Sequence, residues 1–160
     1  MFRKILTFSL LLLVAISCKK ADTNPDFSGI DKIIIEDYIT TKKLTAQSTS
    51  SGLYYVITTP GGTVHPTLNS TVTAYYNGYL ANGNVFDHTT TGSPATFPLA
   101  NVIDGWQEGL QLIGAGGKIK LLVPSALGYG GITKYNNSGA VIIPMNSVLI
   151  FDIELVSFTN

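Results

Sequence analysis

Trp106 is the only tryptophan in the chain, and its surroundings suit it to the floor of an apolar ligand pocket. It lies between Gly105 and Gly109 and follows a Val-Ile pair. The chain also contains 8 Tyr and 7 Phe, the kind of side chain that lines apolar ligand sites. This composition favours an apolar ligand pocket with aromatic walls.

Acid–base and metal chemistry have little support in the titratable residues. Asp87 and His88 are adjacent, but the only other histidine, His65, lies in an unrelated loop. We therefore expect His88 to be a solvated surface residue rather than a catalyst. Two histidines and one cysteine leave no zinc-ligand cluster, and one cysteine excludes an intramolecular disulfide. The sequence predicts no metal and no cofactor.

The Trp106 segment is one of four blocks that together carry a family resemblance. The blocks are AYYNGYLANGNVFD (Ala74 to Asp87), VIDGWQEGLQLI (Val102 to Ile113), IKLLVPSALGYG (Ile119 to Gly130) and IIPMNSVLIFDIEL (Ile142 to Leu155). Each alone is a weak signal, because strings of glycine and aromatic residues recur in many β-rich proteins. In this order, from residue 74 to residue 155, they resemble an FKBP-type peptidyl-prolyl cis-trans isomerase.

The resemblance implies a prolyl isomerase that acts on proline-containing polypeptides. Trp106 would form the floor under the proline ring. The other substrate-binding residues implied are Tyr76, Phe86, Val102, Ile143 and Phe151. The catalytic groups implied are Asp87 at the pocket edge, and the Tyr129 hydroxyl and Ile103 backbone N–H as donors to substrate carbonyls. Macrolides are implied as further ligands, and we expect Phe97 to belong to the core rather than to the pocket wall.

Three features depart from the family pattern. After loss of a signal peptide the chain has no arginine to stand near Asp87, so this carboxylate must rely on the Tyr76 hydroxyl, backbone donors or water. Met145 replaces the second proline of the usual Ile-Pro-Pro segment. The loop from Ile132 to Val141 is longer than in minimal members, with a polar insertion, KYNNS, at residues 134–138. Because this loop overhangs the pocket in the family, it bears on substrate preference.

The N-terminus has the pattern of a bacterial lipoprotein. Two basic residues precede an apolar stretch from Ile5 to Ile16, which is short for a membrane span and predicts a signal peptide over residues 1–17. Cys18 follows in a segment that resembles a lipobox and would carry the lipid anchor. A tether over residues 18–29 would hold the protein at a membrane of the cell envelope, facing the periplasm or the exterior. Ordinary secretion, with Cys18 as a leftover thiol, is the alternative.

Charge and composition exclude some classes of function. Removing Arg3 and Lys4 lowers the 10 basic residues to 8 against 10 acidic residues, a net charge of −2, and leaves no arginine. Phosphate and base recognition depend on Arg forks and clustered cations, so we expect no nucleic-acid partner. With 12% charged and 45% hydrophobic residues, the chain has the composition of a compact globular protein.

A β-rich domain over residues 52–160 must position the pocket. Segments rich in β-branched and aromatic residues predict strands at Leu53 to Thr58, Val72 to Asn77, Val85 to Phe86, Ile119 to Val123 and Val148 to Val156. Asn82-Gly83 predicts a hairpin turn, and one short helix is expected from about Gly105 to Ile113. The predicted fold class is α+β, an FKBP-like twisted antiparallel β-sheet wrapped around one short central helix.

Residues 30–51 are predicted to add a helix and a linker before this domain. Apolar residues at helical spacing predict an amphipathic helix from Ile30 to Leu44 with Asp31 as its N-cap, and Thr45 to Ser51 is a Ser/Thr-rich linker. Two roles are open for the helix. It packs on the domain, as short apolar stripes usually do, or it pairs with a second copy.

Three functions are open at this stage. The first is a membrane-tethered prolyl isomerase that assists the folding of exported proteins. The second is an FKBP-like chaperone or partner-binding module with little or no turnover, which the missing arginine and the altered loop favour. The third, a dimerising or structural lipoprotein, depends only on the Ile30 to Leu44 helix. The retained aromatic residues, with Asp87 and Tyr129, favour the enzyme.

Overall fold

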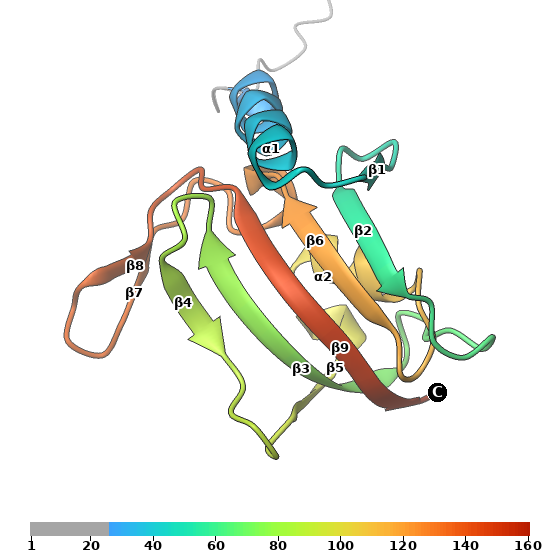
Figure 1. The fold of residues 1–160 in the computed structure, drawn as a ribbon. Helices are drawn as coiled ribbons and strands as arrows, with labels where there is room; N and C mark the ends of the chain where they lie inside the picture. The colour runs from blue at the N-terminus through green and yellow to red at the C-terminus, as the bar shows by residue number, and fades with distance from the viewer. Residues whose placement is uncertain (1–25) are drawn as a thin grey trace, which may run out of the picture.

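The computed structural model describes residues 26–160, which form a seven-stranded antiparallel sheet with one helix on each face (Figure 1). The predicted signal peptide, Cys18 and most of the predicted tether lie outside the described residues. The helices are α1 (Ser28–Lys42) and α2 (Asp104–Leu110). The strands are β1 (Gln47–Ser48), β2 (Tyr54–Thr59), β3 (Thr71–Leu80), β4 (Val85–His88), β5 (Ala95–Pro98), β6 (Lys118–Val123), β7 (Lys134–Tyr135), β8 (Val141–Ile143) and β9 (Leu149–Thr159).

The sheet has the order β1-β2-β6-β9-β3-β4, with β5 paired to another part of β3. The last strand, β9, therefore lies between β6 and β3, and Phe151 on β9 pairs with Leu121 on one side and Gly78 on the other. A separate hairpin, β7–β8, extends from the side of the molecule in Figure 1. The predicted α+β fold and its five strands are confirmed, whereas β1, β5, β7 and β8 were not predicted.

The side-chain alternation of β6 separates the two faces of the sheet. Leu121 and Val123 belong to the main core cluster, which also contains Trp106 of α2. Leu122 points to the opposite face and packs with Ile35 of α1. The last strand alternates in the same way, and its outer residue Ile150 is fully buried while Asp152 is exposed. The two helices thus lie on opposite faces of one sheet.

The β3–β4 hairpin turns at Asn82 and Gly83, as predicted. Only Gly83 has a positive φ, +92°. Its N–H donates to the Leu80 carbonyl, and the Asn82 side chain accepts from the Asn84 N–H. A three-residue loop with glycine at the left-handed position explains this pattern, so the asparagine contributes a hydrogen bond rather than an unusual backbone conformation.

Helix α1 differs from the prediction at both ends. It begins at Ser28, where Asp26 accepts a hydrogen bond from the Ser28 N–H. The predicted N-cap, Asp31, lies instead inside the first turn and is buried, because its carboxylate bonds to a residue of the main domain. The helix ends at Lys42 rather than Leu44, since Lys43 adopts a left-handed conformation with φ 53°.

Helix α1 packs on its own domain. Ile35, Leu122 and Val148 form a buried cluster, with Tyr38 and Ile39 packed against it. Ile33, which contributes to the predicted apolar stripe, is instead 69% exposed. The predicted linker after the helix contains the short strand β1, which pairs with β2. Within residues 26–160, no helix is both long and apolar enough to cross a membrane.

Helix α2 lies close to β6 because two of its residues are glycines. A Cβ on Gly105 would lie 2.6 Å from Cγ1 of Val123, and a Cβ on Gly109 would lie 2.5 Å from Cδ2 of Leu121. The helix is shorter than predicted and ends at Leu110, although Ile113 is still fully buried. This close approach places Trp106 against the inner face of the sheet.

Candidate functional site

A cavity of about 650 Å³ opens on the inner side of the sheet, and we call it the aromatic pocket. It is formed by β3, β4, β5, β9, the start of α2 and the β7–β8 hairpin. All nine protein residues that the family resemblance assigned to substrate binding or catalysis line it. These are Tyr76, Phe86, Asp87, Val102, Ile103, Trp106, Tyr129, Ile143 and Phe151.

Trp106 is held at the bottom of the pocket by three aromatic rings. It is 4% exposed, and its ring centroid lies 5.2 Å from Tyr76, 5.3 Å from Phe151 and 5.4 Å from Phe97, in edge-to-face geometry. Such contacts add about 0.5 to 1.5 kcal/mol each beyond area burial. Phe97 also lines the pocket and is half-buried, so its expected place in the core alone was wrong. It reaches the pocket because β5 pairs with β3, a contact that local sequence patterns do not reveal.

Gly78 creates space for the second aromatic contact of the wall. Phe86 of β4 and Phe151 of β9 meet edge to face with 5.5 Å between their centroids. A Cβ on Gly78, which lies between them on β3, would come within 2.8 Å of both rings. Gly78 is therefore part of the pocket architecture, although its role was not predicted.

Tyr76 is the hydrogen-bond partner of Asp87 at the pocket edge. The Tyr76 hydroxyl donates to Oδ2 of Asp87 at 2.7 Å, and Asp87 itself is exposed. Burial, and then this hydrogen bond and the aspartate charge, raise the pKa of Tyr76, so its hydroxyl keeps its proton. Of the three kinds of donor left open for Asp87 in the absence of an arginine, the structure shows the Tyr76 hydroxyl.

Tyr129 and Ile103 supply donors that the described residues do not use. Burial, followed by the charge of Asp87, raises the pKa of Tyr129, and its hydroxyl bonds to no other described residue. The Ile103 carbonyl accepts from Trp106 and Gln107 at the start of α2, while the Ile103 N–H has no partner within residues 26–160. The Gln107 side chain donates to the Val102 carbonyl at 2.8 Å and fixes this segment. Neither the backbone bond of Gln107 to Ile103 nor its side-chain bond to Val102 was predicted from the sequence.

The polar insertion forms an ordered wall rather than an irregular loop. Its turn is closed by Asn136, whose Oδ1 accepts from the backbone N–H groups of Ser138 and Ala140. Lys134 places its ammonium 4.4 Å from the centroid of the Tyr129 ring. Residues 134–137 of the insertion line the pocket, in agreement with the expected overhang of this loop. The lining residues that were not predicted are Phe97, Asn101 and Ile142.

Neither histidine belongs to the pocket. His88 is exposed on β4 and is absent from the pocket lining. His65 lies elsewhere, with Nδ1 3.0 Å from the Gln111 carbonyl. The interpretation of His88 as a solvated residue is confirmed.

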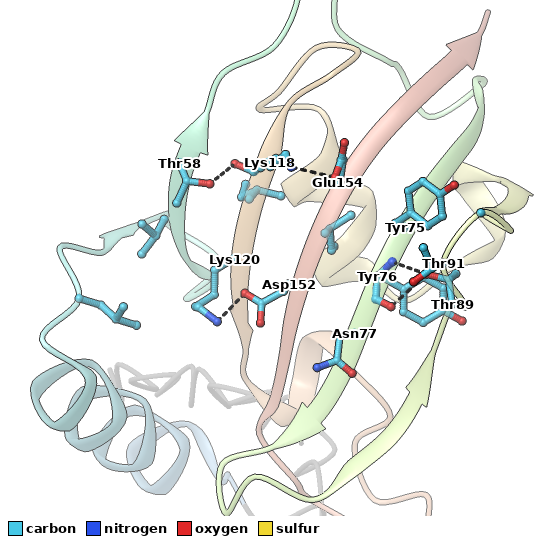
Figure 2. Close-up of a pocket in the computed structure, with 15 residues that line it drawn as sticks. Thr58, Tyr75, Tyr76, Asn77, Thr89, Thr91, Lys118, Lys120, Asp152 and Glu154 are labelled. Carbon is cyan, nitrogen blue, oxygen red and sulfur yellow. Dashed lines mark hydrogen bonds and ion pairs between the residues drawn. The ribbon is translucent and has the colours of Figure 1, made fainter.

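A second groove, of about 670 Å³, lies across the sheet and is drawn in Figure 2. Its charges are paired with one another: Lys118 bonds Glu154 at 2.9 Å, and Lys120 bonds Asp152 at 2.5 Å. Of the nine assigned residues only Tyr76 also borders this groove. The chemistry suggested by the sequence therefore belongs to the aromatic pocket.

Comparison with known proteins gives a family and several relatives. Residues 62–156 match the family described as FKBP-type peptidyl-prolyl cis-trans isomerase. The chain is 49% identical over 114 residues to the FKBP-type peptidyl-prolyl cis-trans isomerase FkpA of Buchnera aphidicola subsp. Schizaphis graminum, covering 70% of this chain and 43% of the relative. It is 41% identical over 116 residues to FkpA of Escherichia coli K12, covering 72% of this chain and 41% of that protein. The chain thus spans less than half the length of these curated relatives.

Solved structures share the fold. The crystal structure of FkpA from Escherichia coli superposes with a TM-score of 0.69 and 36% sequence identity, covering 82% of this chain and 61% of that one. A peptidyl-prolyl cis-trans isomerase from Pseudomonas syringae pv. tomato gives a TM-score of 0.67 and 28% identity, covering 86% of this chain and 99% of that one.

Proposed function

Because the chain belongs to the FKBP-type peptidyl-prolyl cis-trans isomerase family, we propose that it catalyses cis–trans isomerisation of prolyl bonds in polypeptides, within the aromatic pocket. One observation carries the proposal. The nine residues matched to the family's site come from segments far apart in the chain, yet all of them line one cavity around Trp106.

The chemistry requires no covalent intermediate. Resonance gives the prolyl C–N bond partial double-bond character and a rotation barrier of roughly 20 kcal/mol. The twisted transition state loses that resonance and is less polar than the planar ground state, which water favours. An apolar pocket closed at its base by Trp106 therefore stabilises the twisted state relative to the planar one. Each tenfold gain in rate requires about 1.4 kcal/mol of this difference.

The polar groups at the pocket hold the substrate. The Tyr129 hydroxyl and the Ile103 N–H are donors without partners among the described residues, which leaves them free for two substrate carbonyls. The raised pKa of Tyr129 keeps its hydroxyl in the donating form. Asp87, held by Tyr76, orients the substrate at the rim. Trp106, Phe86 and Phe151 surround the proline ring.

A proline tetrapeptide isomerisation assay on the purified protein tests the proposal. We expect saturable turnover that disappears in Tyr129→Phe combined with Trp106→Ala. If the protein is folded by circular dichroism but isomerises the peptide no faster than buffer does, the proposed isomerase activity is wrong.

A binding module with little turnover is the alternative function. Exposed apolar side chains around the β7–β8 hairpin favour it, because they add apolar surface for an unfolded chain beside the pocket; these are Ile132, Tyr135, Val141 and Met145. Suppression of aggregation of a proline-free client, with no isomerisation in the tetrapeptide assay, would select this function.

The cellular location is also a proposal. The apolar segment that ends at Cys18 supports export, cleavage of residues 1–17 and a lipid anchor in the bacterial cell envelope. Cys18→Ala is expected to leave the precursor uncleaved or to move the protein to the soluble fraction. Normal processing and equal membrane association of variant and wild type would contradict lipidation.

Macrolides are proposed as ligands of the same pocket. A macrolide that occupies it would cover the indole of Trp106, the only tryptophan, and change its fluorescence in a saturable way. An unchanged emission spectrum at a concentration that abolishes turnover would place the inhibitor elsewhere.

A further inference from the structure

A buried carboxylate joins helix α1 to the main domain. Asp31 is 1% exposed, and its Oδ2 accepts two hydrogen bonds from Ser125, one from the backbone N–H at 2.8 Å and one from the hydroxyl at 2.7 Å. Ser125 is 4% exposed. The other carboxylate oxygen, Oδ1, has no hydrogen-bond partner within the described residues. Nothing in the proposed mechanism uses this group.

Ser125 in turn holds the segment that carries Tyr129. It opens a short 3-10 helix, Ser125–Leu127, and its carbonyl accepts the N–H groups of Gly128 at 3.0 Å and Gly130 at 2.8 Å. These two glycines flank Tyr129 directly. Asp31 fixes the amide and the hydroxyl of Ser125, and the Ser125 carbonyl fixes the chain on both sides of Tyr129.

Attachment of the helix does not by itself require this carboxylate. The apolar cluster of Ile35, Leu122 and Val148 already buries the contact face of α1. Burying a carboxylate is unfavourable unless its hydrogen bonds compensate, and one oxygen of Asp31 is left unsatisfied. Its two bonds converge on Ser125, whose carbonyl accepts the N–H groups of both glycines beside Tyr129. The Asp31 carboxylate therefore has a role other than attaching α1 to the domain: it orients the turn that carries Tyr129.

We propose that Asp31 is a positioning residue, which holds Tyr129 at the aromatic pocket through Ser125. Asp31 lies outside residues 62–156, which match the family, so α1 would add a support that this matched segment lacks. The inference rests on the proposed function, since Tyr129 matters because it donates to the substrate.

Two substitutions at Asp31 separate hydrogen bonding from charge. Asp31→Ala removes both acceptor bonds, and we expect kcat/KM for a proline tetrapeptide to fall about tenfold, which corresponds to about 1.4 kcal/mol. Asp31→Asn keeps one acceptor oxygen in the same place, and activity within about threefold of wild type is expected. The Asp31→Ala loss should divide between kcat and KM in the same way as the loss in Tyr129→Phe.

A double-mutant cycle tests the route through Tyr129. In the Tyr129→Phe background, Asp31→Ala is expected to cause little further loss, because the hydroxyl it positions is absent. Ile35→Ala is the control: it loosens the same helix and lowers the melting temperature, yet it should leave kcat/KM unchanged well below that temperature. Independent, additive losses from Asp31→Ala and Tyr129→Phe, or an equal loss in Ile35→Ala, would overturn the proposal.

Amide hydrogen exchange keeps the test independent of turnover. Exchange at Gly128 and Gly130, measured relative to the Leu155 amide, should accelerate in Asp31→Ala and remain near the wild-type rate in Asp31→Asn. If the wild-type protein shows no turnover, the proposed function fails, and this exchange pattern still decides whether Asp31 orders the Tyr129 turn. Unchanged exchange in Asp31→Ala would show that it does not.

Discussion

The Asp87 carboxylate is bound by a neutral phenol rather than by a cation. The Tyr76 hydroxyl is 2.7 Å away, and Asp87 is exposed at the rim, so its charge is well screened by water. If the dry cavity supplies most of the rate enhancement, Asp87→Ala should slow kcat/KM by about tenfold, near 1.4 kcal/mol. Steady-state kinetics on a proline tetrapeptide measures this effect.

Phe86 is expected to matter more than Asp87. Phe86→Ala opens the wall that Phe86 forms with Phe151 and admits water beside Trp106. Activity should fall well over tenfold, and the free energy of unfolding should fall by about 3 kcal/mol, at the low end for a phenylalanine truncation because Phe86 is half-buried. Melting curves establish that the assay uses folded protein. If the Asp87→Ala variant has no activity while a folded Phe86→Ala variant keeps most of its activity, catalysis must instead depend on the carboxylate.

The residues of the pocket were predictable where they lie inside recognisable segments. Trp106 and Tyr129 were found from their glycine-flanked positions in blocks typical of the family. Phe97 and Asp31 were misassigned, because the position of each depends on a partner far away in the chain. Phe97 meets Trp106 only after β5 pairs with β3, and Asp31 meets Ser125 across 94 positions of sequence.

At the scale of elements, the packing of α2 on β6 depends on Gly105. A Cβ there would meet Cγ1 of Val123 at 2.6 Å and Cγ2 at 3.0 Å, and a β-branched side chain in a strand has little freedom to move away. Gly105→Ala is therefore expected to lower the free energy of unfolding by about 1 to 2 kcal/mol, after the helix-propensity gain of alanine is included. Urea titration measures the change.

Gly29 provides the matched control for this substitution. It also lies in a helix, α1, but a Cβ at this position would meet no atom within 4 Å. Gly29→Ala should stabilise the protein by roughly 0.4 to 1 kcal/mol, because it reduces the freedom of the unfolded chain. Equal effects of the two substitutions would mean that close packing of α2 is not what requires glycine at residue 105.

The longer elements were easier to predict than the short ones. β3 and β9 are ten and eleven residues long and show clear β composition, so they were found with ends displaced by a few residues. β1 and β7 contain two residues each, too few for any periodicity. Their existence depends on pairing with a neighbour, and the β7–β8 hairpin was consequently described as a polar loop.

For the whole molecule, half-buried tyrosines make stability sensitive to alkaline pH. Burial, then hydrogen bonds with Tyr38 and Asp152, raise the pKa of Tyr79 above its usual value of about 10, and Tyr76 and Tyr129 shift in the same direction. The unfolded chain therefore releases these protons first as pH rises. Their contribution to stability is complete up to about pH 9, roughly one unit below the pKa of the unfolded chain, and is lost as pH rises toward the pKa values of the folded state.

Urea unfolding between pH 8 and pH 11 measures this dependence. The free energy of unfolding should be flat with respect to these groups up to about pH 9 and should then fall. Tyr79→Phe should reduce the steepness of the fall, although it also removes the hydrogen bonds of the Tyr79 hydroxyl with Tyr38, Asp152 and Lys120. If the free energy of unfolding falls equally steeply with pH in wild type and variant, Tyr79 has the same pKa in the folded and the unfolded protein.

The central place of β9 affects when this protein folds. Strands β3 and β6 precede β9 (Leu149–Thr159) in the chain, yet both of them pair with it. Until β9 is synthesised, the β2–β6 pair and the pairs that β3 makes with β4 and β5 are not joined into one sheet. A polypeptide that is exported, as proposed from the segment before Cys18, must be threaded through a translocon while still unfolded. The strand order postpones completion of the sheet until β9 is available, which would favour a precursor that stays competent for translocation.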